Sequence, residues 1–293
     1  MVSLASKERI KRILRTEGLA PNRKMGQHFM VDPQLVSSII EEAALSDDDF
    51  VVEIGPGLGS LTESLARKVR ELLVIEKDQK LLSLLRQLLK DQDNIKYCCQ
   101  DALDFDYASL FQGDRKGLQL VGNLPYYISS AILRRVLPFR TGWKSMTFML
   151  QLEVARRLVA EPGSKEYGIL TLAVDYYAET EIKMSVPAAA FYPRPEVDSA
   201  LIRLIPRPRP PVEIIDEDFF FNIIRAAFQQ RRKMLRNALA KNSLLQLKKD
   251  RVVAAMKAEG LNPRIRGERL SLSSFASLSN RLVVEREESA TSD

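Results

Sequence analysis

The feature that most constrains the fold of this chain is a repeated alternation between short, almost wholly apolar runs and segments with a helical pattern. Strands buried on both faces have such runs, and helices between them imply a parallel sheet. We therefore predict an α/β fold with a Rossmann-like sheet. The predicted strands are 50–54, 72–76, 95–99, 118–122 and 146–150, with helices at 61–69 and 79–89, and the sheet is predicted to continue through 169–177 and 200–205 to an antiparallel edge.

A proline run divides the chain. Residues 206–211 read PRPRPP, and proline fixes φ and lacks an amide donor, which excludes both a helix and a central strand there. We predict an α/β domain over 1–205 and a small all-helical domain over 212–293. The helices predicted outside the sheet region are 6–17, 33–44, 218–240, 248–259 and 273–283.

The excess positive charge lies at the C-terminal end. The sequence holds 44 Lys and Arg against 38 Asp and Glu, a net charge of +6, and residues 206–293 hold 17 basic against 11 acidic side chains. A basic region of this kind suits a polyanionic partner such as nucleic acid, although a solvated helix face accounts for it equally well.

Cysteine and histidine are scarce, which narrows the possible chemistry. Cys98 and Cys99 are adjacent, so a disulfide is disfavoured and a reducing, cytoplasmic location is expected. No run reaches the roughly 18 apolar residues that span a bilayer, so we expect no membrane association. His28 is the only histidine. A Ser-His-Asp triad and a zinc site are therefore disfavoured, and we expect no bound metal.

A glycine-rich loop follows the first predicted strand. Gly55, Gly57 and Gly59 alternate in VVEIGPGLGSLT, and glycine allows a tight turn and close approach to a ligand. A dinucleotide fingerprint would place the third glycine one residue later. Pro56 and the acidic Glu53 also disfavour a pyrophosphate. The loop therefore predicts a nucleoside site without phosphate, and the simpler alternative is a structural turn.

Acidic residues follow the next two strands. Glu76 ends the second strand, where a carboxylate can accept hydrogen bonds from ribose hydroxyls. Asp101 follows the third strand, where it can accept from an adenine amino group. Each acid taken alone is explained as an exposed loop carboxylate. Their serial occurrence at strand ends favours a nucleoside-binding crevice.

The fourth strand runs into GNLPYY, which we interpret as the chemical centre. The Asn123 side-chain oxygen and the Leu124 carbonyl can grip the two N–H bonds of an exocyclic amine and hold its nitrogen for methyl transfer. Pro125 keeps Leu124 out of helical geometry. Tyr126 offers a stacking face for a flipped base. The alternative is a strand-terminating proline turn with two core tyrosines.

These motifs resemble the small-subunit ribosomal RNA adenine N6,N6-dimethyltransferase family (the KsgA/RsmA group), and the resemblance covers nearly the whole chain. It implies S-adenosyl-L-methionine as cofactor, with Gly55 and its loop at the methionine portion, Glu76 at the ribose, Asp101 at the adenine and Asn123 at the transfer site. The matching segments are KMGQHFMVD, VVEIGPGLGSLT, VIEKD, QDAL, GNLPYYIS, FMLQLEVARRL, SKEYGILTL, FYPRPEVDSALIRL and AFQQRRKMLRNAL.

The resemblance also implies roles that the residues alone do not indicate. Residues 26–30 are similar to the family's N-terminal lid, with His28 and Met30 touching the cofactor; many members have Asn in place of His28. Phe191 corresponds to a second stacking wall for the target base. Read without the family, His28 is a lone polar loop residue and Phe191 a core aromatic.

The implied substrate is a pair of adjacent adenines in the 3′-terminal hairpin of small-subunit rRNA, each dimethylated on an immature 30S subunit, with a role in ribosome biogenesis. Loop adenines are accessible to such an enzyme. We expect a monomer. The side chains expected to meet RNA phosphates on the C-terminal helix are Arg231, Arg232, Lys233 and Arg236.

Three other functions are considered. The nearest is the large-subunit rRNA adenine dimethyltransferase of macrolide resistance, which shares fold and reaction but is less similar in the lid, the FYPRPEVDSA segment and the RRK helix. A non-catalytic RNA-binding factor would not need Gly55, Glu76, Asp101 and Asn123 intact. A nicotinamide-dependent oxidoreductase is disfavoured by the glycine spacing and by Pro56.

Overall fold

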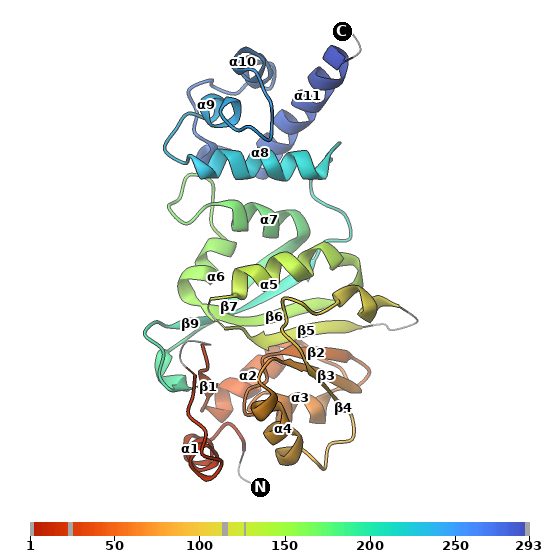
Figure 1. The fold of residues 1–293 in the computed structure, drawn as a ribbon, viewed down its shortest axis with the longest axis vertical. Coiled ribbons are helices and arrows are strands. Elements are labelled where there is room, and N and C mark those ends of the chain that lie inside the picture. Colours follow the sequence, from red (N-terminus) through yellow and green to blue (C-terminus); the bar gives the residue numbers. More distant parts are fainter. Residues whose placement is uncertain (1–2, 23–25, 113–116, 126, 291–293) are drawn as a thin grey trace. The chain divides into compact units, whose positions relative to one another are not determined.

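The computed structural model describes residues 3–22, 26–112, 117–125 and 127–290, and side chains up to residue 285 (Figure 1). The chain forms two compact units. Unit 1 is Met1–Arg156 with Ala178–Pro208, and unit 2 is Arg157–Tyr177 with Arg209–Asp293. The grouping differs from the division expected at the proline run in one respect, because residues 157–177 belong with the C-terminal helices.

Unit 1 is built on a seven-stranded sheet of order β4-β3-β2-β5-β6-β9-β7. Strands β4 to β6 are parallel, while β9 pairs antiparallel with both β6 and β7. The five predicted parallel strands and the antiparallel edge are thereby confirmed. The strands are β2 (Phe50–Ile54), β3 (Glu71–Glu76), β4 (Ile95–Cys99), β5 (Leu118–Asn123), β6 (Ser145–Gln151), β7 (Ala178–Val186) and β9 (Ser199–Pro206).

The sheet is covered on both faces, which explains why its central strands lack polar alternation. Helices α2, α3 and α4 lie on one face and α5 on the other (Figure 1). Local sequence sets the helix starts: the carboxylate of Asp32 caps α2 with Pro33 as first residue, and the carboxylate of Asp78 caps α4. The covering helices are α2 (Pro33–Ala43), α3 (Thr62–Lys68), α4 (Gln79–Leu88), α5 (Ser129–Val136) and α6 (Leu152–Leu158), with 3₁₀ turns at Tyr107–Phe111 and Leu137–Gly142.

The N-terminal helix α1 (Lys7–Thr16) begins and ends where the sequence predicts. The Ser6 hydroxyl accepts the Arg9 amide at its start, and Gly18 follows its end with a φ of +60°. A short antiparallel ribbon joins two distant segments of unit 1: β1 (Phe29–Met30) pairs with β8 (Phe191–Tyr192), and a 3₁₀ turn at Ala188–Ala190 precedes β8.

The strand predicted at residues 169–177 is wrong, because this segment is helix α7 (Ile169–Tyr177) in unit 2. A continuous apolar run does not distinguish a buried strand from a buried helix. The Thr171 hydroxyl accepts the Gly168 amide and donates to the Arg157 carbonyl, which fixes the first turn. The sheet strand is supplied instead by β7 directly after it.

The single helix predicted over 218–240 is also wrong. It is two helices separated at residues 230–234, where the Arg231 side chain is drawn into hydrogen bonds within unit 2. The Leu235 amide donates to the Ile265 carbonyl and starts the second helix. The remaining helices of unit 2 are α8 (Glu217–Gln229), α9 (Leu235–Ala240), α10 (Lys249–Ala258), a 3₁₀ turn at Gly267–Arg269 and α11 (Leu272–Ala290).

Candidate active site

The carboxyl ends of four neighbouring strands open into one cavity, which we call the strand-end cavity. Gly55 follows β2, Glu76 ends β3, Asp101 follows β4 and Asn123 ends β5, and all four line the cavity. Parallel strands bring their carboxyl ends to one edge, and a crevice there is where open α/β sheets bind ligands.

The glycine loop is shaped by its neighbours. Gly55 and Gly57 adopt φ values of +70° and +56°, a region that favours glycine. A Cβ atom at Gly57 would stand 3.1 Å from the Phe29 ring, and one at Gly55 would stand 3.6 Å from the Asn123 carbonyl oxygen. Glycine at position 57 therefore lets the lid strand β1 approach the loop closely, whereas at Gly55 the positive φ, and not the space, favours glycine.

A buried and a half-buried carboxyl group lie beside the loop. Glu53 is buried, and burial, helped by the nearby charge of Glu76, raises its pKa to about 8. Its Oε2 atom has no hydrogen-bond partner among the described residues. Burial also raises the pKa of Glu76, although the backbone amides of Asp78 and Gly57 partly stabilise the charged form. The cavity thus holds acceptor oxygens that lack a full set of donors.

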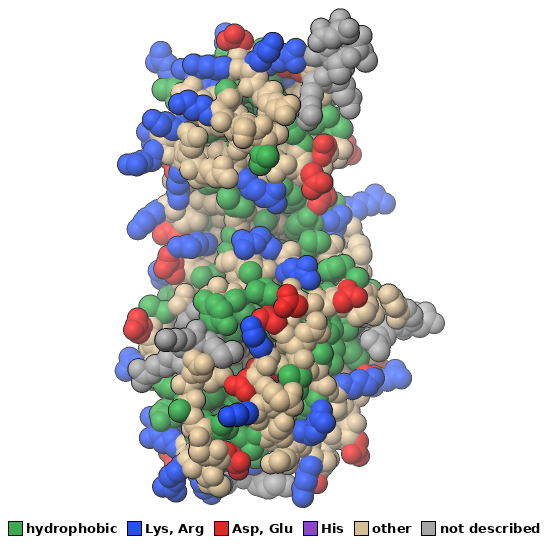
Figure 2. All heavy atoms as spheres, viewed as in Figure 1, with side chains coloured by type: hydrophobic (Ala, Val, Ile, Leu, Met, Phe, Trp, Pro, Cys, Tyr) green, Lys and Arg blue, Asp and Glu red, His purple; other side chains and the backbone are tan. Residues whose placement is uncertain are grey.

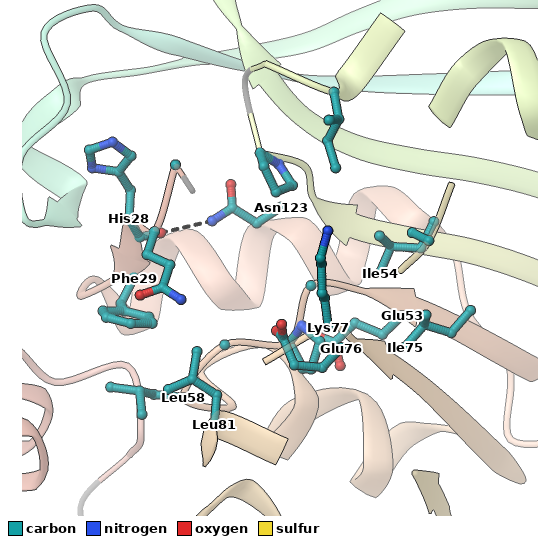
Figure 3. A pocket seen from close by; sticks show the side chains of 18 of the residues that line it. His28, Phe29, Glu53, Ile54, Leu58, Ile75, Glu76, Lys77, Leu81 and Asn123 are labelled. Carbon is teal, nitrogen blue, oxygen red and sulfur yellow. Dashed lines mark hydrogen bonds between the residues drawn. The ribbon is translucent and has the colours of Figure 1, made fainter. Parts of the chain in front are cut away.

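Asp101 is held by Lys77, the one Lys or Arg among the described residues that line the cavity. Its Oδ2 atom lies 2.6 Å from Lys77 Nζ, and its Oδ1 accepts the Leu103 amide. The Lys77 ammonium, followed by that amide, lowers the Asp101 pKa. Lys77 reaches up from the end of β3 beside Glu76 (Figure 3). Asp101 is therefore charged and oriented at the cavity wall.

Asn123 is oriented by the lid segment. Its Nδ2 donates to the His28 carbonyl at 2.9 Å (Figure 3), so the side-chain Oδ1 is the atom left to accept. The His28 ring in turn donates from Nδ1 to the Pro193 carbonyl at 2.7 Å, since a carbonyl can only accept. These two bonds tie β5, the lid and the segment after β8 together, which fixes the amide plane of Asn123.

The other predicted site residues differ in whether they line the cavity. Met30 and Pro125 line the cavity. The Leu124 side chain is buried, and its amide donates to the Met149 carbonyl. Phe191 is only 2 % exposed in the core of unit 1 and does not line the cavity. Tyr126 lies outside the described residues.

Comparison with known proteins identifies the family. The model for ribosomal RNA adenine dimethylase matches residues 18–283. The chain belongs to this family. It is therefore an S-adenosylmethionine-dependent rRNA adenine dimethyltransferase. A protein named ribosomal RNA small subunit methyltransferase A from Geobacillus thermodenitrificans is 42% identical over 284 residues, covering 96% of this chain and 97% of that protein. One of the same name from Moorella thermoacetica is 41% identical over 289 residues, covering 96% and 99%.

Solved structures of related proteins share the fold. A dimethyladenosine transferase from Plasmodium falciparum superposes with a TM-score of 0.71 at 24% identity, covering 90% of this chain and 98% of that one. The 23S rRNA methyltransferase ErmE has a TM-score of 0.64 at 28% identity, covering 87% and 99%. The Rossmann-like methyltransferase sheet and the C-terminal helical region are thus confirmed.

The basic residues predicted to meet RNA differ in what they contact within this dimethyltransferase. Arg231 donates to Glu268 at 2.7 Å and to the carbonyls of Lys165 and Ser164 at 2.8 and 2.9 Å, so its guanidinium is used inside unit 2. Arg236 is half-buried with its Nε buried. Arg232 and Lys233 are exposed. They lie in the turn between α8 and α9 and not on a helix, which corrects the prediction.

Sequence reasoning assigned no role to several lining residues of this dimethyltransferase. Lys77 directly follows Glu76, so its position at a strand end was the available signal. Tyr127, 60% exposed, also lines the cavity. Phe29 is placed there by β1, and a two-residue strand has no periodicity that a sequence can show. Among the described residues, no helix is long and apolar enough to cross a membrane and no acidic, His or Cys cluster could hold a metal.

Proposed function

We propose that this dimethyltransferase modifies N6 of two adjacent adenines in the 3′-terminal hairpin of small-subunit rRNA. The immature 30S subunit is the proposed substrate, and the enzyme thereby takes part in subunit biogenesis as a cytoplasmic monomer. The observation that carries the proposal is the convergence of Gly55, Glu76, Asp101 and Asn123 on one cavity. The small-subunit relatives at 41–42% identity favour this substrate over large-subunit rRNA.

The cavity fits S-adenosylmethionine by its acceptor oxygens. The cofactor carries ribose hydroxyls, amino groups and no phosphate, and the cavity lining holds carboxylate oxygens of Glu76 and Asp101, with Lys77 already paired. The buried Oε2 atom of Glu53 has no hydrogen-bond partner among the described residues, which leaves a polar atom at this wall of the cavity for a ligand to contact. When bound, the cofactor supplies an electrophilic methyl group. We assign His28, Met30, Gly55, Gly57, Glu76, Asp101 and Asn123 to its binding.

The roles of the chain in transfer follow from the end of β5. The Oδ1 atom of Asn123 and the carbonyl of Leu124 accept the two N–H bonds of the adenine amine, which favours a pyramidal nitrogen with its lone pair exposed. Because Asn123 Nδ2 is already bonded to the His28 carbonyl, the amide cannot rotate freely. Preorganised acceptors cost no reordering during the reaction. Pro125 and Tyr126 complete the proposed pocket.

Two further assignments belong to the proposal. The cofactor-binding domain predicted over residues 1–205 is unit 1 with its lid, without residues 157–177, which belong to unit 2. Residues 212–293 form the RNA-binding domain. In it, Arg232 and Lys233 are exposed for phosphate contact, while the Arg231 side chain supports the turn that carries them. Phe191 serves as a stacking wall only if the β8 segment shifts, because its ring is buried among core side chains.

The test is methylation of ribosomal particles. Immature 30S subunits from cells that lack the gene are incubated with the purified chain and an isotopically labelled methyl donor, and the rRNA is mapped by mass spectrometry. We expect two dimethyladenosines in the 3′-terminal hairpin. Large subunits from the same cells are the matched control. Label on large-subunit rRNA alone, or on neither particle, would overturn the proposed substrate.

A further inference from the structure

A basic groove on unit 1 lies apart from the strand-end cavity. It runs between α1 and β8, and we call it the α1–β8 groove. Lys7 and Lys11 line it on α1, and Tyr192, Pro193 and Arg194 line it across from them. It is continuous with a second hollow along α1, because Lys11, Pro21 and Tyr192 line both. That hollow adds the side chains of Arg12 and Arg15.

Within the described parts of the chain, the cations of this groove lack the ion pairs that other cations of unit 1 make with carboxylates. Lys96, Lys144 and Lys183 each contact a carboxylate. None of the groove cations makes an ion pair among the described residues, and the one acid of the lining, Glu8, accepts from the Ser6 hydroxyl. Lys11 lies 5.4 Å from the Tyr192 ring. The five exposed and unpaired cations are Lys7, Lys11, Arg12, Arg15 and Arg194.

Figure 2 shows Lys and Arg side chains gathered at the lower left of unit 1, where Figure 1 labels α1. The helix is firmly held there. Its apolar side chains Ile10 and Leu14 are buried, the Leu4 amide donates to Glu63 at 2.9 Å, and the Ser60 hydroxyl contacts the Leu4 and Met30 carbonyls. A rigid scaffold therefore presents the cations, and little ordering entropy is lost when they bind a partner.

The groove adjoins the reaction site through the β1–β8 ribbon. Met30, which lines the strand-end cavity, is the register partner of Phe191, which lines the groove. His28, whose carbonyl orients Asn123, also bonds to Pro193 in the groove wall. A polyanion in the groove therefore lies next to the segments that close around the transfer site.

We propose that the α1–β8 groove binds the sugar–phosphate backbone of the rRNA strand that flanks the target adenine. The inference rests on the proposed rRNA substrate. Exposed cations without ion pairs among the described residues are complementary in charge to phosphates, and each phosphate neutralised releases counterions. A membrane surface is disfavoured as the occupant, because the apolar face of α1 is already packed inside unit 1 and cannot enter a bilayer.

The experiment compares two triple variants of the full chain. The groove variant, Lys7→Gln/Lys11→Gln/Arg15→Gln, removes three charges from the groove. The control variant, Arg70→Gln/Lys80→Gln/Lys90→Gln, also removes three exposed cations without ion pairs among the described residues. These three side chains line neither the groove nor the cavity. Binding to immature 30S subunits and to the isolated 3′-terminal hairpin RNA is measured over a series of salt concentrations. S-adenosylhomocysteine affinity is measured on every protein as a check on the intact cavity.

We expect the groove variant to bind both RNAs roughly 10- to 100-fold more weakly at low salt, and the slope of log K against log salt to fall by about 2–3. The control variant should keep the wild-type slope, and S-adenosylhomocysteine affinity should be unchanged in both. A wild-type slope in the groove variant, or an equal loss in the control, would overturn the inference.

Two outcomes separate this inference from the proposed function. If wild-type protein neither binds nor methylates the 30S particle, the proposed function fails and the inference with it. If the wild type methylates the particle but the groove variant does so with unchanged KM and salt slope, only the inference fails. Groove-dependent binding to vesicles of anionic lipid, without groove-dependent RNA binding, would also contradict it.

Discussion

The strand-end cavity and the α1–β8 groove lie on the same unit and differ in how they prepare for a ligand. In the cavity, the polar groups are half-buried carboxylates and amides whose positions are set by backbone contacts, as for Glu76 and Asn123. In the groove, the polar groups are exposed ammonium and guanidinium ions that make no ion pair among the described residues, as for Lys11 and Arg15. The first arrangement suits a small ligand of defined shape, and the second a long polyanion.

The comparison teaches that the two regions should respond to different perturbations. Interactions of buried groups are screened little by salt, whereas exposed charges are screened within a Debye length of about 8 Å at physiological ionic strength. Changes in the cavity should therefore alter turnover or cofactor affinity at any salt concentration. Changes in exposed cations should alter RNA binding in a salt-dependent manner.

The largest effect is expected from Asn123→Ala. It removes the acceptor assigned to the adenine amine and the bond to the His28 carbonyl, so we expect kcat to fall at least about 100-fold. RNA binding and its salt slope should stay within twofold of wild type. Single-turnover methylation and a filter-binding assay measure the two quantities. Substantial residual turnover would refute the assigned role.

Glu76→Ala should weaken cofactor binding next most strongly. The change removes charge-assisted hydrogen bonds to the ribose, which are worth about 1.5–3 kcal/mol each. Each lost bond should therefore raise the Kd for the cofactor roughly 10- to 100-fold. Calorimetry with S-adenosylhomocysteine measures the effect. Glu71→Ala, at the other end of β3, is the matched control and should leave the affinity unchanged. Equal affinities in all three proteins would contradict the ribose assignment.

Glu53→Gln should change the pH dependence of stability. Burial raises the pKa of Glu53 from 4.5 to about 8, so the protonated form is the one the fold tolerates. The contribution of protonated Glu53 to the free energy of unfolding is fully present below pH 4.5 and is lost as the pH rises toward 8. The neutral variant should therefore gain Tm relative to wild type between pH 5 and 8, by roughly 2–4 °C per kcal/mol. Parallel Tm–pH curves would exclude this account.

The smallest effect is expected from Arg232→Gln/Lys233→Gln. Both side chains are exposed, so the salt slope of RNA binding should fall by about 1–2 with unchanged Tm. Arg231→Ala provides the contrast, because it leaves Glu268 and two carbonyls without their donor and should lower Tm. If Arg231→Ala alters only the slope, the division between supporting and exposed cations is wrong.

The sequence was sufficient to predict the sheet and the ends of its central strands. The apolar runs of β2, β5 and β6 are almost wholly buried, and buried parallel strands have a pattern that few other structures share. It was insufficient at residues 169–177, where an equally apolar run forms α7, because burial alone does not set the backbone conformation. It also missed the break before α9, which depends on contacts of Arg231 with residues distant in sequence.

The same limit applies to the candidate site. Gly55, Glu76, Asp101 and Asn123 could be chosen because each follows a strand, and the topology then brings them together. The orientation of Asn123 could not be predicted, since it depends on a carbonyl 95 residues away in the chain. The pairing of Lys77 with Asp101 likewise joins the ends of two different strands. Side-chain partners across strands are set by packing, which local patterns do not encode.

The most direct test of the central claim is a crystal structure of the chain bound to S-adenosylhomocysteine. The account predicts the ligand in the strand-end cavity, with its ribose hydroxyls on Glu76, its adenine amino group on Asp101 and its sulfur facing Asn123. A ligand bound anywhere else, or one in the cavity that leaves the Glu76 and Asp101 carboxylates untouched, would contradict it.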